Sequence, residues 1–207
     1  MAAIGRGARL KLDFLERALI VGLYAFLLTR FASAIPSNPL NLFYLVTEGL
    51  VMLLVLTRRS TDQISVSMRD WSVAFSGTFL PMLVVPGVQP LFGPTVVIGG
   101  FSLFVGFTLS VWAKLQLRRS FGIVAANRGL KTAAPYNLIR HPMYLGYLLS
   151  QLGFLSLNLN AWNAMLLTAW TCLQVARIHA EERILISDLV YRRHIARVRY
   201  RLVPLVY

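Results

Sequence analysis

The sequence predicts an all-α membrane protein: a polytopic bundle of about six transmembrane helices that ends in a helical hairpin and a cytoplasmic cap. Hydrophobic residues make up 57% of the 207 positions, and charged residues only 14%, which is less charge than a soluble domain of this size carries. The apolar residues form long runs instead of helical stripes, and the basic residues stand between these runs. Long runs of this kind are typical of membrane spans.

Taken in order, the apolar runs predict six spans, at residues 14–34, 42–56, 71–85, 95–113, 142–157 and 161–178. Pro81 predicts a kink or an end within the third span. Polar residues 1–13, 58–69 and 120–140 separate the runs on one side, and turns at 36–39, 86–94 and 158–163 separate them on the other. We expect the sixth span to continue without a break into a charged helix through about Tyr191, followed by a basic tail.

The basic residues set the orientation, because short cytoplasmic loops carry an excess of Lys and Arg. With a cytoplasmic N-terminus and six spans, every one of the 21 Lys and Arg residues except Arg30 falls on the cytoplasmic side. Both termini and the loop at 120–140 are therefore predicted to be cytoplasmic. The first apolar run has no cleavage site after a short hydrophobic segment, so we expect it to be retained as a helix.

The charge distribution and the cysteine content argue against a nucleic-acid-binding protein, a disulfide-linked fold and a zinc protein. The net charge of +13 lies beside apolar spans and forms no separate basic domain, which argues against a nucleic-acid partner. The single cysteine, Cys172, lies within an apolar run, so neither a disulfide framework nor a zinc cluster is expected. We therefore expect no metal site.

The stretch from Arg140 to Gly146 stands where the longest polar loop meets the fifth span. Pro142 restricts His141 to extended geometry and suits the first turn of a helix. Arg140, His141 and Tyr144 thus gather at a helix N-terminus, whose free N–H groups can receive an anionic or polar ligand. The alternative is an interfacial Arg, His and Tyr of the kind that membrane proteins use routinely. The stretch alone does not decide between the two.

The short turn between the fifth and sixth spans predicts an antiparallel hairpin. The 140–146 stretch must then face the end of the sixth span, where Arg177 and Glu181 share one helix face. Ionisable groups at membrane depth are costly and usually functional. The alternative is an Arg–Glu pair that neutralises itself on a solvated helix end, and for Glu182 and Arg183 we prefer that interpretation.

Three segments, in this order, resemble the isoprenylcysteine carboxyl methyltransferase family and its bacterial relatives. They are residues 130–136 (LKTAAPY), 140–146 (RHPMYLG) and 177–185 (RIHAEERIL), and the resemblance covers roughly the C-terminal third. It implies S-adenosylmethionine as cofactor and Arg177 as the substrate-binding arginine. The implied cofactor-binding residues are Leu130, Lys131, Tyr136, His141, Pro142, Tyr144 and Glu181. The chain departs from the family pattern at Ala134, usually Gly, and at His194, where a second aromatic residue tends to follow Tyr191.

The resemblance implies methyl transfer to a lipid-borne acceptor at the cytoplasmic face, with the carboxylate of a prenylated cysteine or a similar isoprenoid favoured. Arg177 and Glu181 are the candidate catalytic residues. Arg177 would hold a carboxylate by a bidentate contact, and Glu181 would pair with the ammonium or ribose hydroxyls of the cofactor. A carboxylate needs no general base, whereas an amine acceptor needs a proton acceptor, for which Glu181, Glu182 and His179 stay open.

These expectations divide the chain into a four-span membrane region, 1–118, and a methyltransferase region, 119–207, with a cofactor-binding cap. The expected partners are membrane lipids and a lipid or prenylated substrate, and the expected location is an integral membrane protein, in the inner membrane if bacterial. One alternative is a phospholipid amine N-methyltransferase. Another is an NADPH-dependent sterol-type reductase, whose tails resemble residues 199–207, although the usual upstream Lys-Tyr-Gly is absent here. A transporter or scaffold would explain the spans but not the polar residues of the hairpin.

Overall fold

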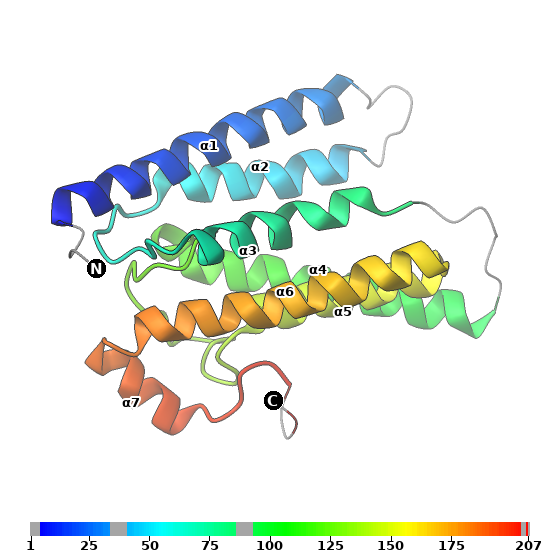
Figure 1. The fold of residues 1–207 in the computed structure, drawn as a ribbon. Coiled ribbons are helices and arrows are strands. Elements are labelled where there is room, and N and C mark those ends of the chain that lie inside the picture. The colour runs from blue at the N-terminus through cyan, green and yellow to red at the C-terminus, as the bar shows by residue number, and fades with distance from the viewer. Residues whose placement is uncertain (1–4, 34–40, 86–92, 204–205, 207) are drawn as a thin grey trace.

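The computed structural model describes residues 5–33, 41–85, 93–203 and 206, and within these ranges the fold is all-helical, as predicted. Figure 1 shows the helices in chain order. They are α1 (Arg6–Ser33), α2 (Asn41–Thr57), α3 (Met68–Phe79), η1 (Leu80–Leu83), α4 (Pro94–Leu117), η2 (Arg118–Ser120), α5 (Pro142–Leu157), α6 (Ala161–Leu185) and α7 (Leu189–Arg197).

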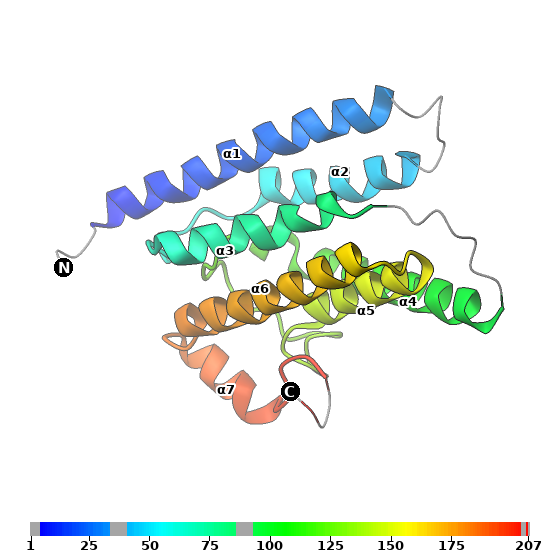
Figure 2. The ribbon, with the colours of Figure 1, turned by 45° about the vertical axis from the view of Figure 1, so that its right-hand side comes forward.

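Helices α1 to α6 run roughly alongside one another, and α7 lies at one end of this bundle (Figures 1 and 2). We call this the loop end. Here α2 is joined to α3 by residues 58–67, and α4 to α5 by residues 118–141. The two connections are tied together by backbone hydrogen bonds, such as Ser65 N–H to the Ala125 carbonyl at 2.9 Å and Asn127 N–H to the Gln63 carbonyl at 2.9 Å. The segment predicted as a long polar loop is thus fixed at the loop end.

Helices α4 and α5 approach each other closely because glycine stands at their contact. A Cβ added at Gly106 would lie 2.4 Å from the backbone nitrogen of Ser150, and one added at Gly146 would lie 2.6 Å from that of Ser110. At Gly153 the nearest atom is 2.5 Å away. Small residues let helix backbones pack in this way in membrane proteins, and the contact fixes where α5 begins.

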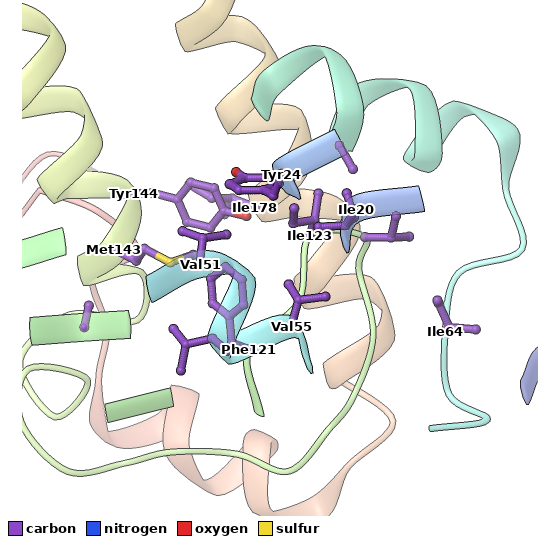
Figure 3. Packing of buried hydrophobic residues seen from close by; sticks show 14 of the residues in the cluster. Ile20, Tyr24, Val51, Val55, Ile64, Phe121, Ile123, Met143, Tyr144 and Ile178 are labelled. Atoms are coloured by element: carbon purple, nitrogen blue, oxygen red, sulfur yellow. The ribbon is translucent and has the colours of Figure 1, made fainter. Parts of the chain in front are cut away.

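A hydrophobic cluster fills the space between the helices near the loop end, and Figure 3 shows its members converging from separate parts of the chain. Its central residues are Ile20 and Tyr24 of α1, Val51 and Val55 of α2, Phe121 and Ile123 of the connection, Met143 and Tyr144 of α5, and Ile178 of α6. The N-terminal helices are therefore packed against the segments that resemble the methyltransferase family.

Along α4 and α6, large apolar side chains are exposed and polar side chains are buried, the reverse of the arrangement in a soluble protein. Phe101 and Phe104 of α4 are 69% and 66% exposed, whereas Asn163, Gln174 and Arg177 of α6 are buried. Within the described residues, one helical stretch, Pro94–Ser120, is long and apolar enough to cross a membrane. The inward polar residues of α6 lower its hydropathy, and Asn163 finds partners inside the bundle through its hydrogen bonds to the Val85 backbone. The six-span arrangement stays a prediction.

The prediction of one helix continuing through Tyr191 is wrong. Helix α6 ends at Leu185, and a separate helix, α7, begins at Leu189. Asp188 causes the break, because its carboxylate accepts the Val190 N–H at 2.8 Å and so caps α7. Short polar side chains favour such caps over a helix interior. The first residues of the predicted basic tail, up to Arg197, are therefore helical.

Elsewhere the boundaries follow the predictions more closely. Pro81 ends α3, which tightens into the 3₁₀ turn η1, and α5 covers residues 142–157 as expected. Helix α1 begins at Arg6, earlier than the predicted span. The predicted turn at 36–39, residues 86–92 of the predicted loop at 86–94, and Pro204 at the end of the tail lie outside the described residues.

Candidate active site

A pocket opens at the loop end, enclosed by residues 117–131, Tyr136, the start of α5, the end of α6, and α7. We call it the loop-end pocket; it holds about 780 Å³ of empty space including its mouth. All of the residues predicted to bind the cofactor line it except Pro142. Pro142 is buried at the first position of α5, where it shapes the start of the helix.

The start of α5 is held by backbone hydrogen bonds on both sides. His141 has φ −127° and ψ 59°, so it lies outside the helical region, as expected before proline, but is less extended than predicted. Its N–H donates to the Arg201 carbonyl at 2.8 Å, and its carbonyl accepts the Tyr144 N–H at 3.1 Å. The Tyr144 amide is thus engaged within the protein, and recognition of a ligand falls to the side chains.

Tyr144 and Glu181 meet across the hairpin, as predicted from the short turn between α5 and α6. The Tyr144 hydroxyl donates a hydrogen bond to Glu181, and His141 Nδ1 lies 3.8 Å from the other carboxylate oxygen. Arg177, one turn away on the same helix, forms no ion pair with Glu181, and among the described residues no Lys or Arg does. Arg177 and Glu181 therefore do not neutralise each other at this helix end. The Glu181 carboxylate faces the pocket instead.

Glu182 differs from the prediction, which assigned it to a solvated ion pair with Arg183. Its carboxylate is mostly buried and accepts from Arg140 Nη1 at 2.8 Å, Arg201 Nε at 2.8 Å and His141 Nε2 at 3.3 Å. Burial alone would raise the pKa of Glu182, but the hydrogen bonds from His141 and Arg201 and the charge of Arg140 lower it to about 2. Arg183 is exposed and pairs instead with a carboxylate of α3. Glu182 therefore fixes the start of α5 to the end of α6.

Residues 198–202 of the basic tail lie against the start of α5. Arg140 N–H donates to the Tyr200 carbonyl at 3.0 Å, and Arg140 Nη2 donates to the Arg199 carbonyl at 3.1 Å. Leu202 is buried in the hydrophobic cluster. No described residue after Arg197 lines the loop-end pocket, so this part of the tail supports the pocket wall from behind.

Arg177 lies in a different cavity. This cavity, which we call the inner chamber, holds about 740 Å³ of empty space including its mouth and is bounded by side chains of α1 to α6 and of residues 121–123. Arg177 donates to the Ile123 carbonyl at 3.1 Å and to Gln174 Oε1 at 3.3 Å, and its guanidinium lies 5.3 Å from the centre of the Tyr144 ring. Met143 lines both cavities. The two predicted catalytic residues thus line different cavities, which share Met143.

A buried network of four charges was missed by the sequence analysis. Arg128 Nη2 lies 2.7 Å from Asp13 Oδ1 and 3.0 Å from Glu16 Oε2, and Arg58 Nη2 lies 3.2 and 2.9 Å from the same two oxygens. All four side chains are at most 1% exposed. The sequence does contain a signal for this network. Asp13 and Glu16 lie in the first helix, and carboxylates that become buried need partners of opposite charge.

This network shapes the wall of the loop-end pocket. Glu16 Oε1 accepts the N–H groups of Ile123 and Val124 at 3.1 and 2.9 Å, and Val124 and Arg128 line the pocket. Helix α1 therefore holds the pocket wall in place. The same Ile123 contributes the carbonyl that Arg177 contacts, so the network bears on both cavities.

Helix α7 adds two pocket residues that the prediction did not assign. The rings of Tyr191 and His194 lie 6.3 Å apart, and both line the loop-end pocket. Burial lowers the pKa of His194, and the neighbouring Arg140 and His141 lower it further. The position where the family tends to place an aromatic residue thus holds an imidazole that favours its neutral form.

Comparison with known proteins gave a match to the segment that contains this site. Residues 98–187 match the model of the isoprenylcysteine carboxyl methyltransferase (ICMT) family, a segment that runs from α4 to the turn after α6 and includes every predicted site residue. The searches of curated proteins and of solved structures gave no match. The resemblance drawn from the motifs is confirmed over residues 98–187, which match the model of this family of methyltransferases.

Proposed function

We propose that the protein transfers a methyl group from S-adenosylmethionine to the carboxylate of a prenylated cysteine or a similar isoprenoid, at the cytoplasmic face of a membrane. The observation that carries this proposal is a pair of cavities that share Met143 as a lining residue. One cavity opens at the loop end and contains Glu181, and the other lies among the helices and contains Arg177. A water-soluble cofactor and a lipid would reach these cavities from different sides.

The loop-end pocket fits the cofactor in the chemistry of its lining. S-adenosylmethionine, when bound, supplies a methyl group activated by a positively charged sulfonium. The Tyr136 and Tyr144 rings suit a cation, the Glu181 carboxylate suits the ammonium or ribose hydroxyls, and Lys131 suits the carboxylate of the amino acid part; all four line the pocket.

Arg177 is suited to hold the acceptor. Its contacts with the Ile123 carbonyl and Gln174 fix the guanidinium, while its buried Nε has no hydrogen-bond partner among the described residues. Arginine matches a carboxylate with its planar donors. The acceptor oxygen would bond to the methyl carbon as the carbon–sulfur bond breaks, so no proton has to move and no general base is needed. Position and the exclusion of water then lower the barrier.

The same proposal places the protein in the membrane. The exposed phenylalanines of α4 and the buried polar groups of α6 support a lipid environment around the bundle. We propose six spans with both termini and the loop end in the cytoplasm. We also propose that the chain divides into two regions between residues 118 and 119. The N-terminal region would then help to enclose the inner chamber, to which α1, α2 and α3 contribute Tyr24, Glu48 and Thr78.

The test is an incubation of the purified protein with S-adenosylmethionine labelled in its methyl group, using membrane lipid extracts and a farnesylated cysteine derivative as acceptors. The proposal expects a labelled lipid whose label is released as methanol by alkali, which identifies a methyl ester. Label that withstands alkali in a phospholipid would establish an amine acceptor instead. Binding of NADPH with no binding of S-adenosylmethionine would replace the proposal with a reductase.

A further inference from the structure

Lys114 of α4 is a buried cation that the proposed reaction does not use. It is 6% exposed, so it does not extend to solvent as interfacial lysines do. It lines the inner chamber together with Arg177. Among the described residues no carboxylate forms an ion pair with it.

Lys114 and Arg177 are connected through two tyrosine rings that meet edge to face. The Lys114 Nζ lies 5.0 Å from the centre of the Tyr147 ring. The rings of Tyr147 and Tyr144 meet edge to face, with centres 6.3 Å apart. The Arg177 guanidinium lies 5.3 Å from the centre of the Tyr144 ring. The four side chains form a row with a cation at each end, which we call the cation–tyrosine row.

The charge balance of the inner chamber is positive. Its charged lining residues are Lys114, Arg177 and the single carboxylate of Glu48 on α2, which lies beside Tyr24. Aromatic faces stabilise a cation without neutralising it, and an uncompensated charge is costly away from water. A chamber with this lining favours an anion and disfavours a protonated amine.

We propose that Lys114 is a specificity-determining residue of the acceptor site, which attracts a carboxylate into the chamber and excludes amine headgroups. The proposal rests on the proposed function. Arg177 supplies the planar donors that orient the carboxylate beside Tyr144, and Lys114, at the other end of the cation–tyrosine row, supplies the second positive charge. Two cations distinguish a carboxylate from a neutral or cationic headgroup more strongly than one.

The experiment compares three ligands on the purified full-length protein: N-acetyl-S-farnesylcysteine, its carboxamide, and farnesylamine. Binding is measured by calorimetry for the wild type and for K114M, K114R and R183M. K114M keeps the length of the side chain and removes its charge, and K114R keeps the charge. R183M is the matched control, because Arg183 is a largely exposed cation that lines neither cavity.

The wild type is expected to bind the carboxylate most tightly. K114M should lose about tenfold or more in carboxylate affinity, the scale of one charged hydrogen bond, with carboxamide affinity unchanged. K114R and R183M should keep the wild-type preference, and S-adenosylmethionine affinity should stay constant in all variants. If K114M does not fold, K114Q replaces it.

Two results would overturn the inference. If K114M loses affinity for the carboxylate and the carboxamide equally, Lys114 only fills space. If its preference for the carboxylate is unchanged, its charge does not act on the acceptor. A wild type that binds the carboxylate without methylating it would refute the proposed function, while the binding comparison would still decide the role of Lys114.

Discussion

The hydroxyl of Tyr144 donates a hydrogen bond to the carboxylate of Glu181, which joins the first turn of α5 to the last turns of α6. The two residues are 37 positions apart and are brought together by the hairpin. The bond leaves Glu181 facing the loop-end pocket while the Tyr144 ring faces Arg177. The proposed cofactor and acceptor sites therefore share one side chain, and mutations on either side should have separable effects.

Glu181→Gln should weaken the binding of S-adenosylmethionine by about tenfold or more, because it removes the charge and keeps the shape. The amide oxygen can still accept the Tyr144 hydroxyl, so the melting temperature should change little. Calorimetric titration of the cofactor checks the first point and thermal unfolding the second. Arg183→Gln, a charge change at an exposed position of the same helix, is the control. Unchanged cofactor affinity in Glu181→Gln would remove this residue from the cofactor site.

Arg177→Lys should lose turnover with a carboxylate acceptor while cofactor affinity stays near that of the wild type. Lysine keeps the charge but not the planar donors that match a carboxylate. The loss should correspond to about 1–3 kcal/mol of transition-state stabilisation, measured as kcat/KM for the farnesylated cysteine derivative. Nearly full activity would mean that Arg177 has only a structural role, through its contacts to Ile123 and Gln174. That result would favour an amine acceptor.

Glu182→Gln should destabilise the protein at pH 7 by about 1–3 kcal/mol, since buried donors of Arg140, Arg201 and His141 lose a charged acceptor. The pKa of Glu182 is lowered from 4.5 to about 2 in the folded protein. Its stabilising effect is therefore complete above about pH 4.5 and is lost as the pH falls towards 2. The melting temperatures of the mutant and the wild type should converge over that window. A constant difference down to pH 2 would contradict the assigned pKa.

Gly106→Ala should destabilise the bundle by about 1–3 kcal/mol, the usual cost of overpacking. The added methyl group would meet the α5 backbone at Ser150, 2.4 Å away, where no flexible side chain can move aside. Gly100→Ala in the same helix is the matched control, because a Cβ at Gly100 meets nothing within 4 Å. Thermal unfolding of both variants in the same detergent measures the difference. Equal melting temperatures would show that α4 and α5 are not packed this closely.

Both termini should face the cytoplasm if six spans cross the membrane. The basic residues support this orientation because they gather on the elements of the loop end. Reporters fused to the C-terminus, one active only inside the cell and one only outside, check it. A C-terminal reporter active only outside would overturn either the number of spans or their orientation.

The hairpin shows how far the motifs alone could lead. The short turn after α5 makes α5 and α6 antiparallel. The sequence alone therefore predicts that His141 and Tyr144, at the start of α5, lie opposite Glu181, near the end of α6. It did not place Arg177 in a separate cavity. That separation depends on which side of the Tyr144 ring each α6 residue meets, and helix periodicity states only that Arg177 and Glu181 share a face.

The sequence by itself determined the helical class, most of the helix positions, and the family segment with its candidate residues. These follow from local signals: apolar runs, prolines and short motifs whose effect lies within a few residues. Only the tertiary structure decided the partners of buried charges. Glu182 pairs with Arg140 and Arg201, and Arg128 pairs with Asp13 and Glu16, more than a hundred residues away. A buried charge takes whichever opposite charge the packing of helices brings within reach, and that packing is a property of the whole fold.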